Sequence, residues 1–339
     1  MTTPLQSAAA PLAALLRAAA IAPLDDIGWI RITGSDRVRW LNGMATNNIQ
    51  ALKPGEGCYN FFLNAQGRIQ GDATAWMLED SILLETAADR IPALMAMLDH
   101  FIIMDDVELA DLGTFPGLTV AGPQAPAMLA QLGLHIQEPL HETGQILGDL
   151  RLKVHRIHSP LVPRFELWPQ GEDTASLATS LTEAGLAQTT PEALDQLRIL
   201  EGTPRYGTDI TDRDLPQETG QTRALHFTKG CYLGQEIVER IHSRGNVHRS
   251  FSGFVLTGPL PAPGTQLEAE STPVAELTSV ASIHLPESGS IAARATAGPV
   301  QLALGIIRRE TLANAQACNL TLTYPGGTAT PIALPYAVP

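Results

Sequence analysis

The sequence predicts an α+β protein made of two antiparallel, ferredoxin-like α+β modules and a small C-terminal β-barrel. The chain has 339 residues, more than one hydrophobic core usually supports, so two or three domains are expected. Strand, hairpin and helix patterns alternate before residue 251, which favours antiparallel sheets. After that point the pattern changes to prolines, glycines and short β-prone runs. We therefore expect domains over residues 1–115, 116–250 and 251–339.

The first module is predicted from a sequence of strands, helices and one hairpin. The expected elements cover residues 27–33 (strand), 36–43 (helix), 57–63 and 69–78 (hairpin), 81–86 (strand), 89–104 (helix) and 107–109 (strand). Asp72 lies among apolar neighbours in the second hairpin strand. A lone acid is costly to bury, so Asp72 either faces solvent or has a function. Asn47 belongs to a short polar segment that fits a ligand contact or, preferably, an Asx turn.

The second module repeats this alternation without a residue-level repeat. The expected strands cover 118–121, 153–157 and 165–168, and the expected helices cover 125–132, 174–184 and 191–201. The last helix starts at Thr190-Pro191 and ends at Gly202. Glu201 lies at its C-terminus, where a carboxylate opposes the helix dipole, and this disfavours a purely structural role. His155 and His158 are not at helical metal-ligand spacing, and we expect no metal site.

The N-terminus is rich in alanine but does not resemble a signal peptide. It lacks a positively charged start, and Arg17 interrupts the apolar run. Leu12, Leu15 and Leu16 instead predict a helix that packs on the domain. The chain has only three scattered cysteines and no apolar window of membrane-spanning length, so we expect a cytoplasmic protein without a disulfide framework.

The charge balance argues against a stable complex with nucleic acid. The chain carries a formal net charge of -13 and has a pI near 5.1, whereas phosphate binding needs an extended positive surface. A basic island runs from Gln221 to Arg249, with five Lys/Arg residues and two acids. It indicates either a local site for an anionic ligand or a solvated helix face.

The segment from Thr228 to Glu236 concentrates reactive and conformationally special residues. Cys231 lies between Gly230 and Gly234, just before a predicted helix whose N-terminus, together with Lys229, would favour the thiolate. A reactive cysteine and a small buried hydrophobic residue remain equally open from this local chemistry. The histidines around Cys231 match no common zinc spacing, and Walker and dinucleotide-binding loops are absent.

Lys229-Gly230-Cys231-Tyr232-x-Gly234-Gln235-Glu236 resembles the signature of the YgfZ-type folate-binding proteins. These proteins are relatives of the glycine-cleavage T-protein, an aminomethyltransferase, and of a mitochondrial iron-sulfur assembly factor. The wider pattern matches in order and spacing from about Ile30 to about Phe254. The resemblance implies three domains in a ring around a central cavity for tetrahydrofolate or a one-carbon derivative. It also implies a role in assembly or repair of iron-sulfur enzymes, the potential protein partners, and in tRNA modification that depends on them.

The same resemblance implies roles for individual residues. Glu201 and Tyr206 lie in an element similar to the one whose acid binds the pterin in T-proteins, although the usual alanine before the glycine is missing. Asp72 matches the T-protein acid that faces the reactive nitrogen region of the folate. We therefore expect Glu201, Asp72, Asn47, Tyr206 and Lys229 to bind the folate. Any catalysis is expected from Cys231 and Asp72, and whether the protein is an enzyme stays open.

Two other functions are compatible with parts of the sequence. A true aminomethyltransferase would need the acid to act on the one-carbon unit and a surface for a lipoyl carrier. T-proteins typically carry an acidic or apolar residue in place of Cys231, which favours the folate-binding accessory protein. A thiol-dependent redox protein is disfavoured because no second cysteine lies near Cys231 in the sequence.

Overall fold

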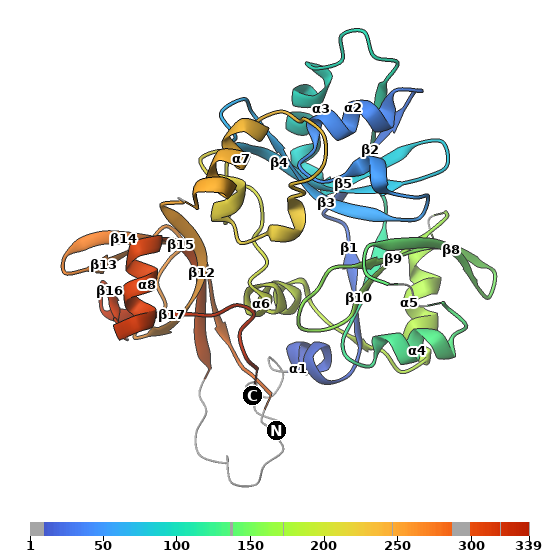
Figure 1. The fold of residues 1–339 in the computed structure, drawn as a ribbon. Helices are drawn as coiled ribbons and strands as arrows, with labels where there is room; N and C mark the ends of the chain where they lie inside the picture. Colours follow the sequence, from blue (N-terminus) through green and yellow to red (C-terminus); the bar gives the residue numbers. More distant parts are fainter. Residues whose placement is uncertain are drawn as a thin grey trace, which may run out of the picture.

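The computed structural model describes residues 10–135, 138–171, 173–245, 247–286, 299–318 and 320–338. Two β-sheets and one closed β-barrel surround a central helix, α6 (Pro191–Glu201) (Figure 1). The expected N-terminal helix is α1 (Ala10–Arg17), whose Leu12 and Leu15 are buried. The part of that prediction before residue 10 lies outside the described residues. None of the described helices combines the length and the apolar character needed to cross a membrane.

The first sheet has five strands in the order β3-β4-β5-β2-β6, all with antiparallel neighbours. Four of these strands and two helices follow the ferredoxin-like βαββαβ order. β3 is an additional strand at the edge of the sheet, and it pairs with β4 to form the hairpin that the sequence predicts. The elements are β2 (Ile27–Thr33), α2 (Arg37–Met44), η2 (Ile49–Ala51), β3 (Gly57–Leu63), β4 (Ile69–Met77), β5 (Ile82–Ala87), η3 (Ala88–Arg90), α3 (Ile91–Asp99) and β6 (Glu108–Thr114).

The helix expected over residues 89–104 is shorter in the structure. α3 ends at Asp99, and Ile103 and Met104 are exposed. The chain turns there because Asp106 accepts hydrogen bonds from the backbone and side chain of Ser35, which fixes the start of β6 beside β2. Apolar residues continue the helical spacing, but this tertiary contact ends the helix one turn early.

The second sheet has six strands in the order β11-β1-β7-β10-β9-β8. The elements are β1 (Ala20–Leu24), β7 (Gly117–Ala121), α4 (Ala125–Gln131), β8 (His141–Leu147), β9 (Leu150–Ile157), β10 (Arg164–Pro169), α5 (Thr174–Glu183) and β11 (Ala187–Gln188). Only the β1–β11 pair is parallel. β1 occupies the place of the fourth ferredoxin-like strand, next to β7, although it comes from the N-terminal segment of the chain.

A long loop segment of the second predicted domain packs on the first sheet instead. It contains η4 (Pro216–Glu218), η5 (Thr222–Ala224) and α7 (Gln235–Arg244), and buries Tyr232 and Val238 against Tyr59 and Phe61. Gly234 has φ +80°, and a Cβ there would lie 2.6 Å from the carbonyl oxygen of Asn64. The two modules therefore exchange chain segments, and α7 is held directly against the β3–β4 turn.

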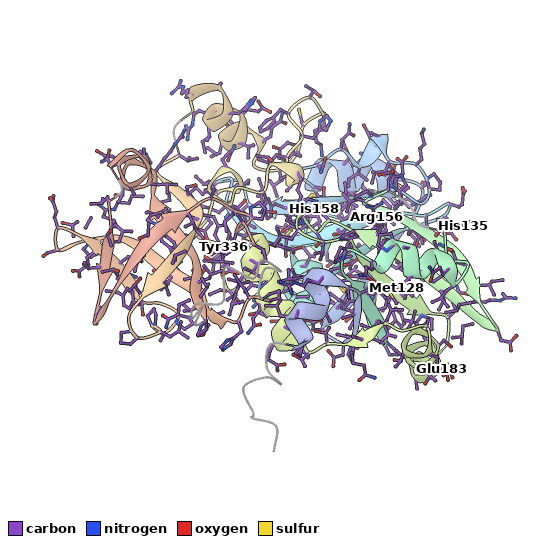
Figure 2. All side chains as sticks on the ribbon, turned by 90° about the horizontal axis from the view of Figure 1, so that it is seen from below. Met128, His135, Arg156, His158, Glu183 and Tyr336 are labelled. Atoms are coloured by element: carbon purple, nitrogen blue, oxygen red, sulfur yellow. The ribbon has the colours of Figure 1, made fainter. Side chains whose placement is uncertain are left out.

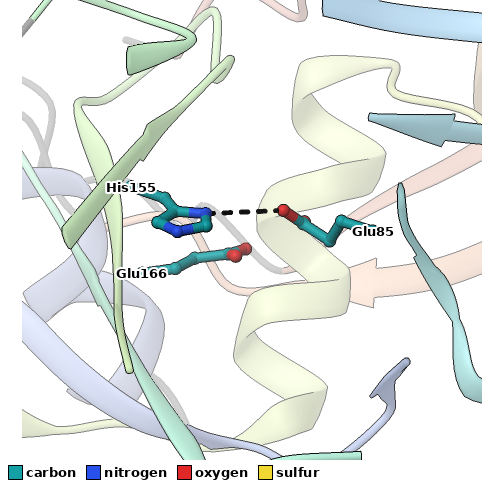
Figure 3. Close-up of side chains that lie close together, drawn as sticks. All are labelled: Glu85, His155 and Glu166. Carbon is teal, nitrogen blue, oxygen red and sulfur yellow. Dashed lines mark ion pairs between the residues drawn. The ribbon is translucent and has the colours of Figure 1, made fainter. Parts of the chain in front are cut away.

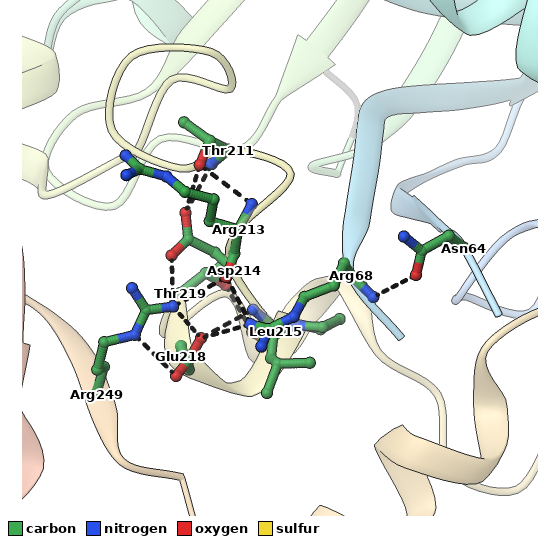
Figure 4. A network of polar contacts seen from close by, with 10 residues as sticks. Asn64, Arg68, Thr211, Arg213, Asp214, Leu215, Glu218, Thr219 and Arg249 are labelled. Atoms are coloured by element: carbon green, nitrogen blue, oxygen red, sulfur yellow. Dashed lines mark hydrogen bonds and ion pairs between the residues drawn. The ribbon is translucent and has the colours of Figure 1, made fainter. Parts of the chain in front are cut away.

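The C-terminal unit is the expected barrel, closed in the order β12-β15-β14-β13-β16-β17. Its elements are β12 (Arg249–Thr257), β13 (Gln266–Ala269), β14 (Thr272–Ile283), β15 (Val300–Arg308), α8 (Arg309–Cys318), β16 (Leu322–Tyr324) and β17 (Gly327–Ile332). α6 packs between α1 and the barrel, because Leu197 and Leu200 share one apolar cluster with Leu12, Phe251 and Leu304. Ion pairs also connect the barrel to the loop that precedes it. Arg249 of β12 binds Asp214 at 3.1 Å and Glu218 at 2.9 Å (Figure 4).

Candidate functional site

Asp72 lies on β4 and makes a short hydrogen bond inside the first module. Its Oδ2 accepts from the hydroxyl of Tyr59, on the neighbouring strand β3, at 2.6 Å. Burial raises the pKa of Asp72, while the bond from Tyr59 and the charge of Arg223 oppose that rise. The guanidinium of Arg223 lies over the Tyr59 ring, 4.1 Å from its centroid. The acid is thus an enclosed carboxyl with a polar partner, and not a solvent-facing strand residue.

Glu201 is the last residue of α6 and is buried. Its Oε1 accepts from the hydroxyl of Ser159 and, at 3.5 Å, from the backbone N–H of Leu161. No described residue donates a hydrogen bond to its Oε2. Burial raises the pKa of Glu201, and Ser159, Arg164 and Arg223 counteract this. One carboxylate oxygen is therefore fixed by the protein, and the other can accept from a ligand.

Arg223, on η5, connects these two acids. Its buried guanidinium has a lowered pKa because of desolvation, and the charges of Tyr59, Asp72 and Glu201 act against that shift. The same cation, together with burial, lowers the pKa of His158, which lies near the middle of the molecule in the view of Figure 2. The structure thus brings residues from β3, β4, α6 and η5 around one guanidinium. We call Tyr59, Asp72, Glu201 and Arg223 the central polar group.

Tyr206 borders the central polar group through Arg90. The Arg90 guanidinium lies 5.9 Å from the Tyr206 ring centroid, and its charge also acts on Asp72. The Tyr206 hydroxyl is 3.5 Å from the carbonyl oxygen of Ile69, and burial raises its pKa to about 12. The phenol is therefore neutral and weakly bonded. It can donate to a ligand without breaking a strong internal contact.

Asn47 supports the central polar group from behind. Its amide nitrogen donates to the backbone carbonyls of Tyr59 at 3.0 Å and Arg223 at 2.8 Å, while its Oδ1 accepts from the N–H of Asn48. Both amide hydrogens are therefore engaged within the protein. Asn47 therefore has a positioning role in this structure, and its expected contact with folate stays a prediction.

Lys229 is also used inside the protein. Its Nζ donates to the carbonyl oxygens of Asn42 (2.7 Å), Ala45 (2.7 Å) and Asn47 (2.5 Å), at the C-terminal end of α2. Burial lowers its pKa to about 8. An ammonium has three N–H donors, and three carbonyls occupy them. Lys229 thus secures the loop, and its expected contact with folate stays a prediction.

Cys231 is exposed, so the alternative of a small buried hydrophobic residue does not hold. It lies in the turn before α7, as expected, and Gly230 and Glu236 beside it are exposed as well. Tyr232 is buried, and its N–H donates to Gln235 Oε1 at 3.2 Å, which closes the turn. Among the described residues, no hydrogen bond or ion pair links Cys231 to the central polar group.

The basic island divides between structural and surface residues. Arg249 is paired with acids of the 211–219 loop, as described above. Arg240, Arg244 and His248 line a cavity of about 390 Å³ together with Arg68 of the first module. This cavity, rather than the whole island, retains the positive lining expected for an anionic group.

Sequence reasoning missed Arg223, Tyr59 and Ser159 as members of the site. Arg223 was only one of several basic residues in the island, and Tyr59 belonged to an apolar strand. No local signal distinguishes them, since their role arises from contacts between distant segments. The hairpin did offer one clue, because Tyr59 and Asp72 are diagonal neighbours on β3 and β4, where Tyr59 pairs with Thr74.

Comparisons with known proteins agree with this architecture. Residues 5–229 match the family model described as "GCVT N-terminal domain". A protein of Yersinia enterocolitica named "tRNA-modifying protein YgfZ" is 28% identical over 72% of this chain and 74% of its own. An aminomethyltransferase of Streptomyces coelicolor is 29% identical over 83% of this chain and 79% of its own. A chloroplastic protein of Arabidopsis thaliana is 27% identical over 76% of this chain, and the match spans only 61% of its length.

One solved structure has the same fold over almost the whole chain. It is the glycine cleavage system aminomethyltransferase T from Bartonella henselae, with a TM-score of 0.79 and 20% sequence identity, over 97% of this chain and 89% of the other. At this identity the likeness establishes the fold alone. The family match over residues 5–229 shows that the chain belongs to the GCVT N-terminal domain family.

Proposed function

We propose that the protein binds tetrahydrofolate, or a one-carbon derivative, at the central polar group. In this proposal it acts as an accessory protein for the assembly or repair of iron-sulfur enzymes and for the tRNA modification that depends on them. The observation that carries the binding proposal is the convergence of the half-buried Asp72 and the buried Glu201, from different modules, on the charge of Arg223, which lies over the Tyr59 ring. The name of the YgfZ relatives supports the link to tRNA modification.

Glu201 suits the pterin end of the ligand. A carboxylate can accept parallel hydrogen bonds from an amino group and a ring N–H. Ser159 and Leu161 hold Oε1, so the carboxylate is oriented before the ligand arrives, and Oε2 stays available to accept. Preorganisation of this kind reduces the entropy lost on binding.

Asp72 suits the central region of the ligand. A reduced folate supplies a nucleophilic nitrogen that can carry a one-carbon unit. Burial raises the pKa of Asp72, so this carboxyl can hold a proton more readily than an exposed aspartate. Tyr59 fixes Oδ2, and Arg223 supplies a positive charge that stabilises the ionised form. The residues present therefore match both the donors and the acceptors of a reduced folate.

Calorimetric titration with tetrahydrofolate tests this proposal. The wild type should bind one equivalent, and Glu201→Gln should bind at least about 10-fold more weakly because a charge-assisted hydrogen bond is lost. Glu192→Gln is the matched control, since this exposed acid lies at the opposite end of the same helix. Absence of binding by the wild type would refute the folate proposal, and equal binding by Glu201→Gln would refute the role of that residue.

A second candidate function is aminomethyl transfer. The enclosed acid Asp72 and the similarity to the Streptomyces aminomethyltransferase favour it. The assay is transfer of an aminomethyl group from a lipoyl carrier to tetrahydrofolate. Turnover that is lost in Asp72→Asn would establish the transferase, whereas folate binding without turnover would support the accessory protein.

A further inference from the structure

A second cluster of ionisable residues lies where the first two sheets meet, and the proposed function does not use it. Glu85 comes from β5 of the first sheet, while His155 and Glu166 come from β9 and β10 of the second (Figure 3). Each offers one ligand atom, and these atoms all lie within 4.8 Å of one another. Residues far apart in sequence thus converge from two modules on one point.

The inward-facing atoms of this cluster lack hydrogen-bond partners. His155 is 2% exposed and Glu166 is 1% exposed. Nevertheless, Nδ1 of His155 and Oε2 of Glu166 have no hydrogen-bond partner among the described residues. Oε2 of Glu85 lies 3.8 Å from that Nδ1, too far for a hydrogen bond. Buried polar atoms are nearly always satisfied, so these unpaired atoms call for a ligand between them.

The surrounding residues orient the cluster in the way that metal sites require. Nε2 of His155 lies 3.2 Å from Oε2 of Glu142, and Lys153 holds the other oxygen of Glu142 at 2.9 Å. The carboxylate of Glu142 beside Nε2 fixes the orientation of the ring and directs Nδ1 toward Glu85. Trp76 donates to Glu85 Oε2 at 2.6 Å and fixes that side chain as well.

A cavity adjoins the cluster on the side of His155. A cavity of about 270 Å³ is lined by His155, Glu142, Lys153 and the aromatic residues Trp29, Trp168 and Phe115. Trp29 and Trp76 pack against the His155 ring, with centroids 5.6 Å and 4.4 Å away. The cavity thus adjoins the cluster at His155, and the indole rings of Trp29 and Trp76 cover the imidazole.

We propose that Glu85, His155 and Glu166 bind a divalent transition-metal cation, and that Glu142 positions His155. One imidazole and two carboxylates are ligands that Zn²⁺ and Mn²⁺ accept, and three protein ligands leave a further position for water. Bound there, the ion joins the first sheet to the second. This inference departs from the sequence-based expectation, which assigned no metal and treated His155 as an ordinary strand residue.

The placement of two carboxyls in this cluster supports the proposal. Glu85 and Glu166 each offer a carboxylate oxygen, and these atoms lie within 4.8 Å of each other and of the His155 ligand atom. Carboxyls crowded in this way repel each other when ionised. A divalent cation removes that repulsion and satisfies the unpaired atoms at the same time.

Metal binding by the full chain tests the proposal. The protein is stripped with a chelator, dialysed against Zn²⁺, and its metal content is measured by mass spectrometry. We expect one Zn²⁺ per chain, and a visible absorption band when Co²⁺ is used instead. Glu166→Gln keeps the shape of the side chain and removes a ligand, so affinity should fall at least about 10-fold.

Three further variants control the interpretation. His141 and Glu56 form a more exposed His–Glu pair, 4.0 Å apart, and His141→Gln should bind Zn²⁺ like the wild type. Glu85→Gln tests a ligand from the other module if Glu166→Gln does not fold. Glu142→Gln should shift the Co²⁺ spectrum as well as weaken binding. Failure of the wild type to bind Zn²⁺, Mn²⁺ or Co²⁺, or equal binding by folded Glu166→Gln, would overturn the metal site without affecting the folate proposal.

Discussion

Arg223 and Lys229 belong to the same long loop, yet their cations face different surroundings. The charge of Arg223 acts on the carboxyls of Asp72 and Glu201, which come from two different modules. Lys229 ends on three backbone carbonyls at the end of α2 and has no donor left. The comparison shows that Lys229, in the segment from Thr228 to Glu236, anchors the loop. Arg223, just before this segment, supplies the positive charge at the candidate site.

The largest expected effect concerns the anchoring residue. Lys229→Met leaves three carbonyls without their donor, so the free energy of unfolding should fall by about 3 kcal/mol. Denaturant unfolding followed by circular dichroism measures this loss. Lys53→Met is the control because Lys53 is exposed, and its effect should stay within about 0.5 kcal/mol. A Lys229→Met variant as stable as this control would break the comparison.

The next effect concerns the cation at the central polar group. Arg223→Gln should weaken tetrahydrofolate binding by about 10-fold to 100-fold, because a charged partner of both acids is lost. Arg31→Gln, on the exposed face of β2, should bind normally. Calorimetry gives both affinities, and denaturant unfolding should show a smaller stability loss for Arg223→Gln than for Lys229→Met. The reverse ranking would contradict the division of roles within the loop.

A smaller effect is expected in the pH dependence of stability. The pKa of Asp72 is raised above its ordinary value of 3.8 by burial, so the folded state binds this proton more tightly than the unfolded state does. Its contribution to stability is complete below pH 3.8 and is lost as pH rises through the folded-state pKa. The Asp72→Asn variant resembles the protonated form of Asp72 and cannot ionise. Its free energy of unfolding should therefore not show this decrease as pH rises.

Thermal unfolding of both proteins across pH 4 to 7 measures this difference. The wild type should lose stability relative to Asp72→Asn as pH rises, by about 1.4 kcal/mol for each unit of pKa shift. A constant difference between the two proteins would show that Asp72 is not perturbed by its surroundings.

The smallest effect on stability is expected at Cys231. Because its side chain is exposed, Cys231→Ser should change the free energy of unfolding by less than about 0.5 kcal/mol. Alkylation followed by peptide mapping should modify Cys231 much faster than Cys58, which is buried and whose pKa is raised to about 11. We expect tetrahydrofolate to slow the reaction at Cys231, and an unchanged rate would separate this thiol from the ligand site.

Local signals in the sequence were enough for most of the fold. The Thr190 cap accepts from the N–H of Ala193, and Gly202 takes the left-handed conformation that ends α6. Both features depend on neighbouring residues alone. By contrast, the sequence did not predict α8, β8 or the placement of β1 beside β7, because pairing partners and short polar helices leave weak patterns.

The candidate site was only partly predictable for the same reason. Asp72 and Glu201 attracted attention because an acid in an apolar strand or at a helix C-terminus is unfavourable. Arg223 has no such mismatch, and its importance depends on contacts with three distant segments. The three backbone contacts of Lys229 were not predictable, because the carbonyls that bind it become close only after α2 and the loop pack together.

A crystal structure with tetrahydrofolate bound tests the central claim most directly. The claim predicts the pterin edge on Oε2 of Glu201, with the middle of the folate beside Asp72 and Arg223. A folate bound elsewhere would contradict it, for example in the cavity of about 280 Å³ between residues 208–214 and the barrel.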